Sequence, residues 1–258
     1  MPYKQRNGCA LYYEVQGQGE PLIFLHGLGG SMEQVQALFP QLDHIQLILI
    51  DQRGHGKSTG SFTSYTFADL AEDVLAIADE LHLAQFSIAG ISMGAAVSVY
   101  LLLHAPKRIK KTLLIRNAWI NEVMSPSFRS LYALLADCLK KKEKARFQAN
   151  AYFCELQMAA PAAAASLLQC FDDPAARRYP EKFIEIPKQK PFQDLFDLHQ
   201  IKQPVMILAN HRDPIHPFAF GQCLHAHIPH SSFYEIISKS ENAAKQAEQI
   251  AFYLHAFL

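Results

Sequence analysis

Short apolar runs alternate with helical patterns along most of this chain. The runs at residues 21–25 and 47–50 are uninterrupted and too short for helices, so they predict buried strands. Strands that alternate with helices predict an α/β fold with a mostly parallel sheet, flanked by helices on both faces. Further strands are predicted at 9–16, 85–89, 111–115, 204–208 and 232–237, and helices at 66–83, 95–105, 218–228 and 243–257.

The pattern changes between residues 117 and 204, where no run of strand type occurs. Residues 127–144 place leucines on one face of an amphipathic helix, and 145–156 and 161–171 predict two more helices. Four prolines then divide the chain into loops and short helices. The sequence therefore predicts a core formed by residues 1–117 and 204–258, with a helical insertion at 118–203 after the sixth strand.

The pentapeptide Gly90-Ile91-Ser92-Met93-Gly94 lies between a predicted strand and a predicted helix. A serine flanked by glycines at such a junction is typical of a nucleophile elbow. The tight turn forces the serine into a strained backbone conformation, and small residues two positions away avoid a collision. The hydroxyl is then exposed above the sheet, and the N–H of Met93 at the helix N-terminus points where an oxyanion would form.

Other glycine-rich and polar segments also follow predicted strands, at the carboxyl ends where α/β sheets carry their chemistry. They are His26-Gly27-Leu28-Gly29-Gly30, the segment Asp51-Gln52-Arg53-Gly54-His55-Gly56-Lys57-Ser58, and Asp213-Pro214-Ile215-His216-Pro217. With the elbow, these segments occur in the order and at the spacings of the α/β-hydrolase family, which the chain resembles over about residues 8–258. The resemblance implies an α/β-hydrolase sheet with 118–203 as a helical cap over the active site.

The same resemblance implies roles for individual residues. Ser92 is expected to be the nucleophile, and Asp213 the acid that orients its base. The backbone N–H groups of Leu28 and Met93 are expected to form the oxyanion hole. His26 is expected to anchor the oxyanion loop, and Asp51 and Arg53 are expected to fix the loop beside it.

One expected residue is missing. The family places its catalytic histidine after the final strand, but residues 235–242 contain none. Lys239 occupies that region, and a desolvated lysine with a lowered pKa can act as a base; we therefore predict Lys239 as the third catalytic residue. Ser240 in the same place, and His216 from the loop after the preceding strand, are the alternatives. A further alternative is that the protein has lost full turnover, because removal of a triad base leaves residual catalysis.

The composition bears on the partners and the cellular compartment of the protein. Lysine plus arginine equals aspartate plus glutamate, 24 each, so neither nucleic acid nor a membrane surface is expected as a partner. Five scattered cysteines without a C-x-x-C pair favour reduced thiols, and the first residues lack an apolar signal segment, so we expect a cytoplasmic protein. No metal or organic cofactor is implied, and the oligomeric state is not predicted.

Together these features predict a serine hydrolase acting on a small ester, thioester or amide, slow or atypical because the usual histidine is absent. Aromatic and aliphatic residues of the insertion, including Phe128, Leu131, Tyr132 and Phe153, favour an apolar substrate. The alternative is a non-catalytic protein that binds or senses a small molecule on a degenerate hydrolase scaffold.

Overall fold

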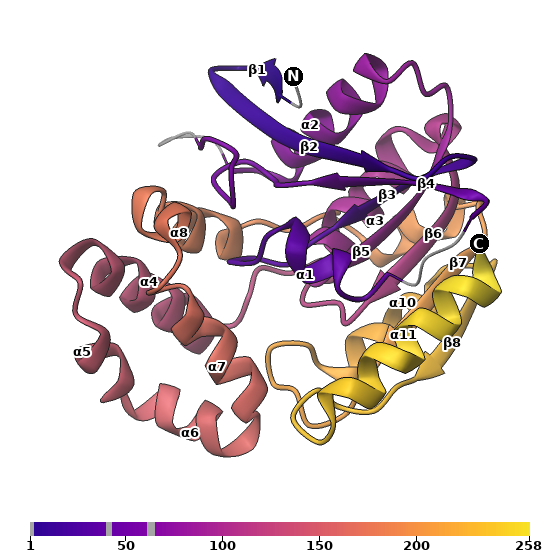
Figure 1. Cartoon of the computed structure of the whole chain (residues 1–258). Coiled ribbons are helices and arrows are strands. Elements are labelled where there is room, and N and C mark those ends of the chain that lie inside the picture. The colour runs from indigo at the N-terminus through magenta and orange to yellow at the C-terminus, as the bar shows by residue number, and fades with distance from the viewer. Residues whose placement is uncertain (1–2, 40–42, 61–64) are drawn as a thin grey trace.

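One sheet organises the molecule (Figure 1). The computed structural model describes residues 3–39, 43–60 and 65–258, and within them eight strands pair in the order β1-β2-β4-β3-β5-β6-β7-β8. Strand β2 is antiparallel to β1 and β4, and every pair from β4 to β8 is parallel. The strands are β1 (Tyr3–Arg6), β2 (Cys9–Gln16), β3 (Glu20–Leu25), β4 (Ile45–Ile50), β5 (Phe86–Ile91), β6 (Ile109–Ile115), β7 (Val205–Ala209) and β8 (Ser231–Glu235).

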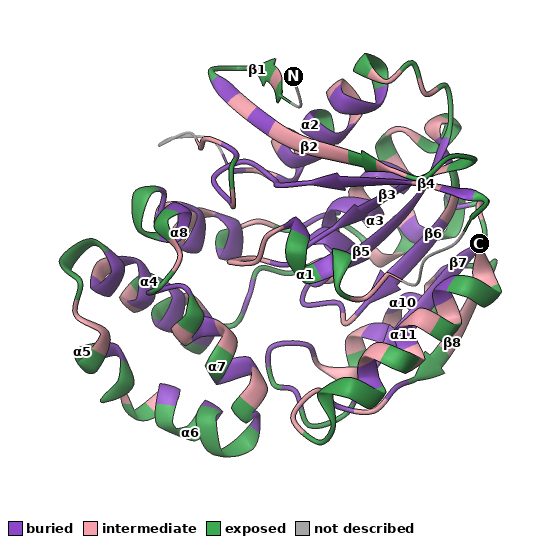
Figure 2. Ribbon diagram, in the orientation of Figure 1, coloured by how far each residue is buried: buried purple, intermediate pink, exposed green. Residues whose placement is uncertain are grey.

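Helices cover both faces of this sheet, which confirms the predicted fold class. Successive residues of a strand point to opposite faces: in β3, Leu22 and Phe24 join one buried apolar cluster, and Ile23 and Leu25 join the other. Figure 2 shows the central strands buried, while the outer surface of α11 is exposed. The helices are α1 (Met32–Gln36) and α11 (Ala243–Phe257) on the face of Leu22, and α2 (Phe67–Glu80), α3 (Met93–His104) and α10 (Phe218–His227) on the face of Ile23.

Local signals explain where the core helices begin. The Thr66 hydroxyl accepts a hydrogen bond from the Asp69 backbone N–H at 3.0 Å, and the Asp69 carboxylate accepts one from the Thr66 N–H. This reciprocal pair satisfies N–H groups that a helix N-terminus otherwise leaves without partners. It lies where the sequence predicts the helix to start.

The helices between β6 and β7 form a separate group beside the sheet (Figure 1). The prediction of one continuous helix at 145–156 is wrong, because two helices occupy this region. The side chain of Asn150 accepts a hydrogen bond from the Phe153 N–H and so caps the start of the second helix. The elements are α4 (Pro126–Lys141), α5 (Lys144–Gln148), α6 (Ala151–Ala159), α7 (Pro161–Gln169), α8 (Pro174–Arg178), α9 (Lys182–Glu185) and the 3-10 turns η2 (Ile186–Lys188) and η3 (Leu195–Gln200); η1 (Pro106–Arg108) precedes β6.

Strand β1 was not predicted, because Tyr3–Arg6 is polar and mostly exposed at the edge of the sheet. All five cysteines carry free thiols. None of the helices in the described residues has both the length and the apolar character that a membrane span requires.

Candidate active site

Ser92 lies between the end of β5 and the first residue of α3. Its backbone has φ 56° and ψ −111°, outside the regions that side-chain-bearing residues normally occupy. A methyl group at Gly90 would lie 2.2 Å from the Gly94 carbonyl oxygen, and one at Gly94 would lie 2.5 Å from the Leu25 carbonyl oxygen. Both glycines are therefore required by close backbone contacts around the turn. The Ser92 N–H donates to the Ile115 carbonyl at 2.9 Å, which ties the turn to β6.

The loop after β3 lies against the same serine. A methyl group at Gly27 would come within 3.3 Å of the Ser92 Cβ. The N–H groups of Leu28 and Met93 donate no hydrogen bond to any residue in the described part of the chain. Unused backbone donors beside a strained serine are the arrangement that an oxyanion hole requires.

Two buried histidines hold this loop in place. His26 Nδ1 donates to the Gly27 carbonyl at 2.8 Å, and its Nε2 accepts from the Gln52 N–H at 3.0 Å. His55 Nδ1 donates to the Arg53 carbonyl at 3.0 Å, and its Nε2 accepts from the Gly29 N–H at 3.1 Å. Each ring thus uses one donor and one acceptor, as a neutral imidazole must. Burial lowers the pKa of both histidines, which keeps them neutral.

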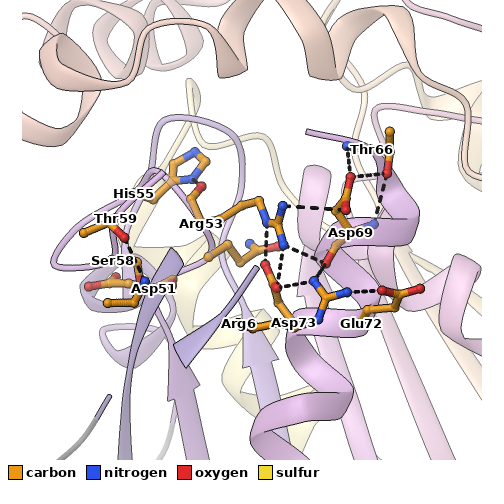
Figure 3. A network of polar contacts seen from close by, with 12 residues as sticks. Arg6, Asp51, Arg53, His55, Ser58, Thr59, Thr66, Asp69, Glu72 and Asp73 are labelled. Atoms are coloured by element: carbon orange, nitrogen blue, oxygen red, sulfur yellow. Dashed lines mark hydrogen bonds and ion pairs between the residues drawn. The ribbon is translucent and has the colours of Figure 1, made fainter. Parts of the chain in front are cut away.

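A network of charged groups fixes the neighbouring loop (Figure 3). The buried Arg53 guanidinium donates to both carboxylate oxygens of Asp73 on α2 at 2.6 Å, and Arg6 donates to the same carboxylate at 2.9 Å. Asp51 accepts hydrogen bonds from the backbone N–H groups of Met32 and Lys57, each at 2.8 Å. These contacts agree with the anchoring roles that the resemblance implies for His26, Asp51 and Arg53.

Asp213 follows β7 and is paired with two side chains. Its Oδ2 is 2.9 Å from His216 Nδ1 and forms a short ion pair with Nη2 of Arg116, the residue after β6. Burial opposes ionisation of the carboxyl, but His216 and Arg116 outweigh burial and hold the pKa of Asp213 well below its usual range. Burial also lowers the pKa of His216; the charge of Asp213 opposes that effect and the charge of Arg116 adds to it.

The proton arrangement on His216 follows from these partners. An ionised carboxylate only accepts hydrogen bonds, so we assign the proton of neutral His216 to Nδ1, where it is donated to Asp213. Arg116 Nη2 lies farther from the same nitrogen, at 3.2 Å. With this assignment Nε2 carries a lone pair, and no residue in the described ranges forms a hydrogen bond with that nitrogen.

Lys239 lies in the loop between β8 and α11 and is partly buried, but unlike His216 it is not paired with a carboxylate of the described residues. Its ammonium group forms no hydrogen bond or ion pair within the part of the chain that the structure describes. Burial lowers the pKa of Lys239, as does the charge of Arg116, while Asp213 raises it. The next residue, Ser240, uses its hydroxyl oxygen to accept a hydrogen bond from the Ala162 N–H at the start of α7, at 3.2 Å.

Five of these residues line one cavity of about 810 Å³: Leu28, Ser92, Arg116, His216 and Lys239. Met93, Asp213 and Ser240 are not part of its wall. Leu28 and Ser92 come from the loops after β3 and β5, while Arg116, His216 and Lys239 follow β6, β7 and β8. Tyr132 of α4 and Leu167 of α7 supply part of the wall from the inserted helices. The described residues contain no group of three or more histidine, cysteine, aspartate or glutamate side chains that could hold a metal ion.

The sequence did not single out Arg116, and it gave His216 only as one of several alternatives. Arg116 adopts a left-handed conformation with φ 51°, and its N–H donates to the Leu208 carbonyl at 2.8 Å. The available signal was its position directly after a buried strand, at the edge where the other polar residues gather. For His216, the signal was the spacing of three residues from Asp213 in a turn that contains Pro214.

Comparisons with known proteins agree with this fold. Residues 20–244 match the family model described as alpha/beta hydrolase fold. The 3-oxoadipate enol-lactonase 2 of Acinetobacter baylyi is 29% identical over 251 residues, covering 90% of this chain and 86% of that protein. The dihydrolipoyllysine-residue acetyltransferase component of the acetoin cleaving system of Pseudomonas putida is 34% identical over 131 residues, and the match spans 49% of this chain and 35% of that protein.

Solved structures extend the likeness to the whole chain. Est816, described as an N-acyl homoserine lactone degrading enzyme, gives a TM-score of 0.77 with 21% identity and covers 100% of both chains. The enol-lactonase from Burkholderia xenovorans LB400 gives a TM-score of 0.74 with 22% identity, covering 98% of this chain and 100% of that one. With a family model that matches most of its length, this chain belongs to the alpha/beta hydrolase fold family and is an enzyme of the alpha/beta hydrolase type.

Proposed function

We propose that this enzyme is a serine hydrolase that cleaves a small ester, thioester or amide through Ser92. The observation that carries the proposal is the strained serine beside two unused backbone N–H groups, on the wall of a cavity. A relative that covers most of the chain is named as an enol-lactonase, and a lactone is a cyclic ester.

In the proposed reaction, Ser92 Oγ attacks the substrate carbonyl carbon and gives up its proton to a base. The N–H groups of Leu28 and Met93 stabilise the negative charge that develops on the carbonyl oxygen. The base returns the proton to the leaving group as the acyl–oxygen, acyl–sulfur or acyl–nitrogen bond breaks. Water then attacks the acyl-enzyme by the same route in reverse and frees Ser92.

We assign the base to His216. Its Nδ1 is 2.9 Å from the ionised Asp213, the relation that fixes the tautomer and stabilises the imidazolium in a serine triad. Its other ring nitrogen has no partner in the described ranges, and the residue shares the cavity with Ser92. Lys239, the base predicted from the sequence, stays the alternative, since it lines the same cavity and burial lowers its pKa.

The pH dependence of kcat/KM distinguishes these two bases. A His216 base with a lowered pKa gives activity that rises with pH, with the midpoint of the rise below the ordinary histidine pKa of about 6.5. A Lys239 base gives activity that continues to rise in alkaline solution, because an ammonium group must lose its proton first. A kcat/KM profile that is flat at neutral pH and rises in alkaline solution would therefore assign the base to Lys239 instead of His216.

Helices α4 to α9 have a proposed role as the cap of this site. Tyr132, Leu167 and Asp173 contribute the cavity wall opposite the loops of the core. Access of substrate to Ser92 then depends on these helices, as in enzymes whose reaction is enclosed by a lid. This assignment gives residues 118–203 the function of shaping the substrate pocket.

Labelling with a fluorophosphonate probe tests the nucleophile directly. Wild type should be labelled and should hydrolyse p-nitrophenyl esters, and Ser92→Ala should abolish labelling and lower kcat by at least about 1,000-fold. Ser98→Ala is the matched control, because Ser98 is a buried serine on α3, the helix that follows Ser92, and its hydroxyl donates to the Gly94 carbonyl. Labelling that survives in Ser92→Ala, or an inert wild type that only binds small molecules, would contradict the proposal.

A further inference from the structure

The wall of the cavity that contains Ser92 carries two cationic side chains as well as the acidic residues Glu33, Asp172 and Asp173. Arg116 and Lys239 contribute a guanidinium and an ammonium group, and both residues line the wall that Ser92 lines. Asp213 is the carboxylate that pairs with Arg116, and His216 is kept neutral by burial. Around Lys239, these two cations therefore act together with one anion, Asp213.

Lys239 is the cation without a counter-ion. Its ammonium group has no hydrogen-bond or ion-pair partner in the described residues, although burial removes part of its hydration. A partly desolvated charge is costly unless it is paired. An anion entering the cavity would relieve both the lost hydration and the repulsion from Arg116.

Arg116 also has donor capacity to spare. Its Nη2 contacts Asp213 and His216, whereas its Nη1 forms no hydrogen bond with any residue in the described ranges; its Nε also has no partner but is buried. A guanidinium presents several N–H groups in a planar fork that matches a carboxylate. Arg116 can thus keep Asp213 as a partner and still contribute charge to a ligand held by Lys239.

The other acidic residues around the cavity do not neutralise this pair. Both carboxylate oxygens of Asp173 accept hydrogen bonds from the first N–H groups of α8. Asp172 pairs with Lys144, and Glu33 accepts a hydrogen bond from the Ser31 hydroxyl. The charges that act on Lys239 are those of Arg116 and Asp213.

We propose that the substrate carries a carboxylate, held by Lys239 with support from Arg116, while its ester, thioester or amide carbonyl lies at Ser92. This inference rests on the proposed hydrolase function and names the class of substrate for the same site. An acid-bearing acyl group differs from the apolar substrate that the sequence favours. A cavity of about 810 Å³ accommodates a small acyl chain that ends in a carboxylate.

A pair of esters tests the proposal, with uncatalysed hydrolysis subtracted. One is p-nitrophenyl hydrogen glutarate, and the other is the neutral p-nitrophenyl pentanoate with the same acyl chain length. In Lys239→Met, which removes the charge and keeps an unbranched side chain, the ratio of kcat/KM for the anionic ester to that for the neutral ester should fall about tenfold, mainly through KM. Lys239→Arg should restore most of that ratio.

Lys245→Met is the matched control. Lys245 is exposed on α11 and is not part of the cavity wall, so its substitution should keep the wild-type ratio. A ratio that is unchanged in Lys239→Met overturns the proposal. Equal losses on both esters also overturn it, since they would show that Lys239 acts on the reaction itself.

A binding measurement keeps the inference separate from the proposed chemistry. Monomethyl glutarate should bind to Ser92→Ala in calorimetry, and Ser92→Ala combined with Lys239→Met should bind it about tenfold more weakly. Hydrolysis that persists in Ser92→Ala would refute the serine mechanism and leave this binding result to stand by itself. Equal affinity of the two proteins would refute the carboxylate site.

Discussion

Replacing Gly94 with alanine should damage the active site through a contact with the neighbouring strand. The new Cβ would lie 2.5 Å from the Leu25 carbonyl oxygen and 2.8 Å from the Leu25 Cβ. Strand β3 is hydrogen-bonded to β4 on one side and to β5 on the other, so its backbone is held in place. The start of α3 must therefore move by about 1 Å to reach ordinary van der Waals separation.

Two effects of opposite sign set the magnitude. Alanine is favoured over glycine within a helix by about 1 kcal/mol. Overpacking against a fixed backbone costs about 1–3 kcal/mol, so we expect a net loss of stability of about 1 kcal/mol. The effect on catalysis is larger, because a displacement of about 1 Å at a reacting group can lower the rate about 100-fold.

Urea unfolding and kcat/KM on a p-nitrophenyl ester measure the two effects separately. Gly221→Ala is the control, since Gly221 lies on α10 and is not part of the cavity wall, while its new Cβ would meet the side chains of Ala209 and Phe233 at 2.9 Å. That control should lose stability and keep most of its kcat/KM. If Gly94→Ala retains wild-type stability and turnover, the close contact between α3 and β3 does not position Ser92, and the steric argument fails.

Three other substitutions probe the charged groups. Arg116→Met should raise the pKa of His216, because the arginine charge lowers it, and should therefore shift the ascending limb of the kcat/KM profile to higher pH; an unshifted limb would argue against a His216 base. Arg53→Met should lower the free energy of unfolding in urea by about 3 kcal/mol, because the buried Asp73 carboxylate then keeps Arg6 as its remaining cation. An unchanged free energy of unfolding would contradict this explanation. Burial lowers the pKa of Lys182 to about 8, whereas the unfolded chain has a lysine pKa of about 10.4. Wild-type stability should therefore gain a contribution as pH rises from about 8 to 10.4, where the unfolded state binds more protons, and Lys182→Met should lack it. Parallel pH curves for the two proteins in urea unfolding would refute this.

Much of the fold was predictable because its signals are local. Strands β3 to β7 are largely buried on both faces, so most of them leave an uninterrupted apolar run such as 47–50. The capping residues Thr66 and Asp69 marked the start of α2, and the glycines around Ser92 marked the elbow. The conformation of each of these segments depends on residues a few positions away in the chain or on one adjacent strand.

The assembly of the site was less predictable, because its contacts join distant segments. Nothing local to Arg116 indicates that it pairs with Asp213, 97 residues away. The spacing of three residues between Asp213 and His216 is visible in the sequence, but whether the two side chains meet depends on how the turn after β7 folds. Strand β1 escaped prediction for a similar reason, since its pairing with β2 rather than its own polar composition makes it a strand.

The hydrogen bond between Ser240 and Ala162 links the loop after β8 to helix α7 of the inserted group. Ser240 follows Lys239, which lines the cavity, and Ala162 is the second residue of α7 in the inserted group. Movement of α7 away from the core would either break this hydrogen bond or displace Lys239, the residue before Ser240. If the inserted helices act as the proposed cap, substrate entry and binding of the proposed carboxylate would therefore be coupled. A variant whose cap opens more widely would then bind the anionic substrate more weakly.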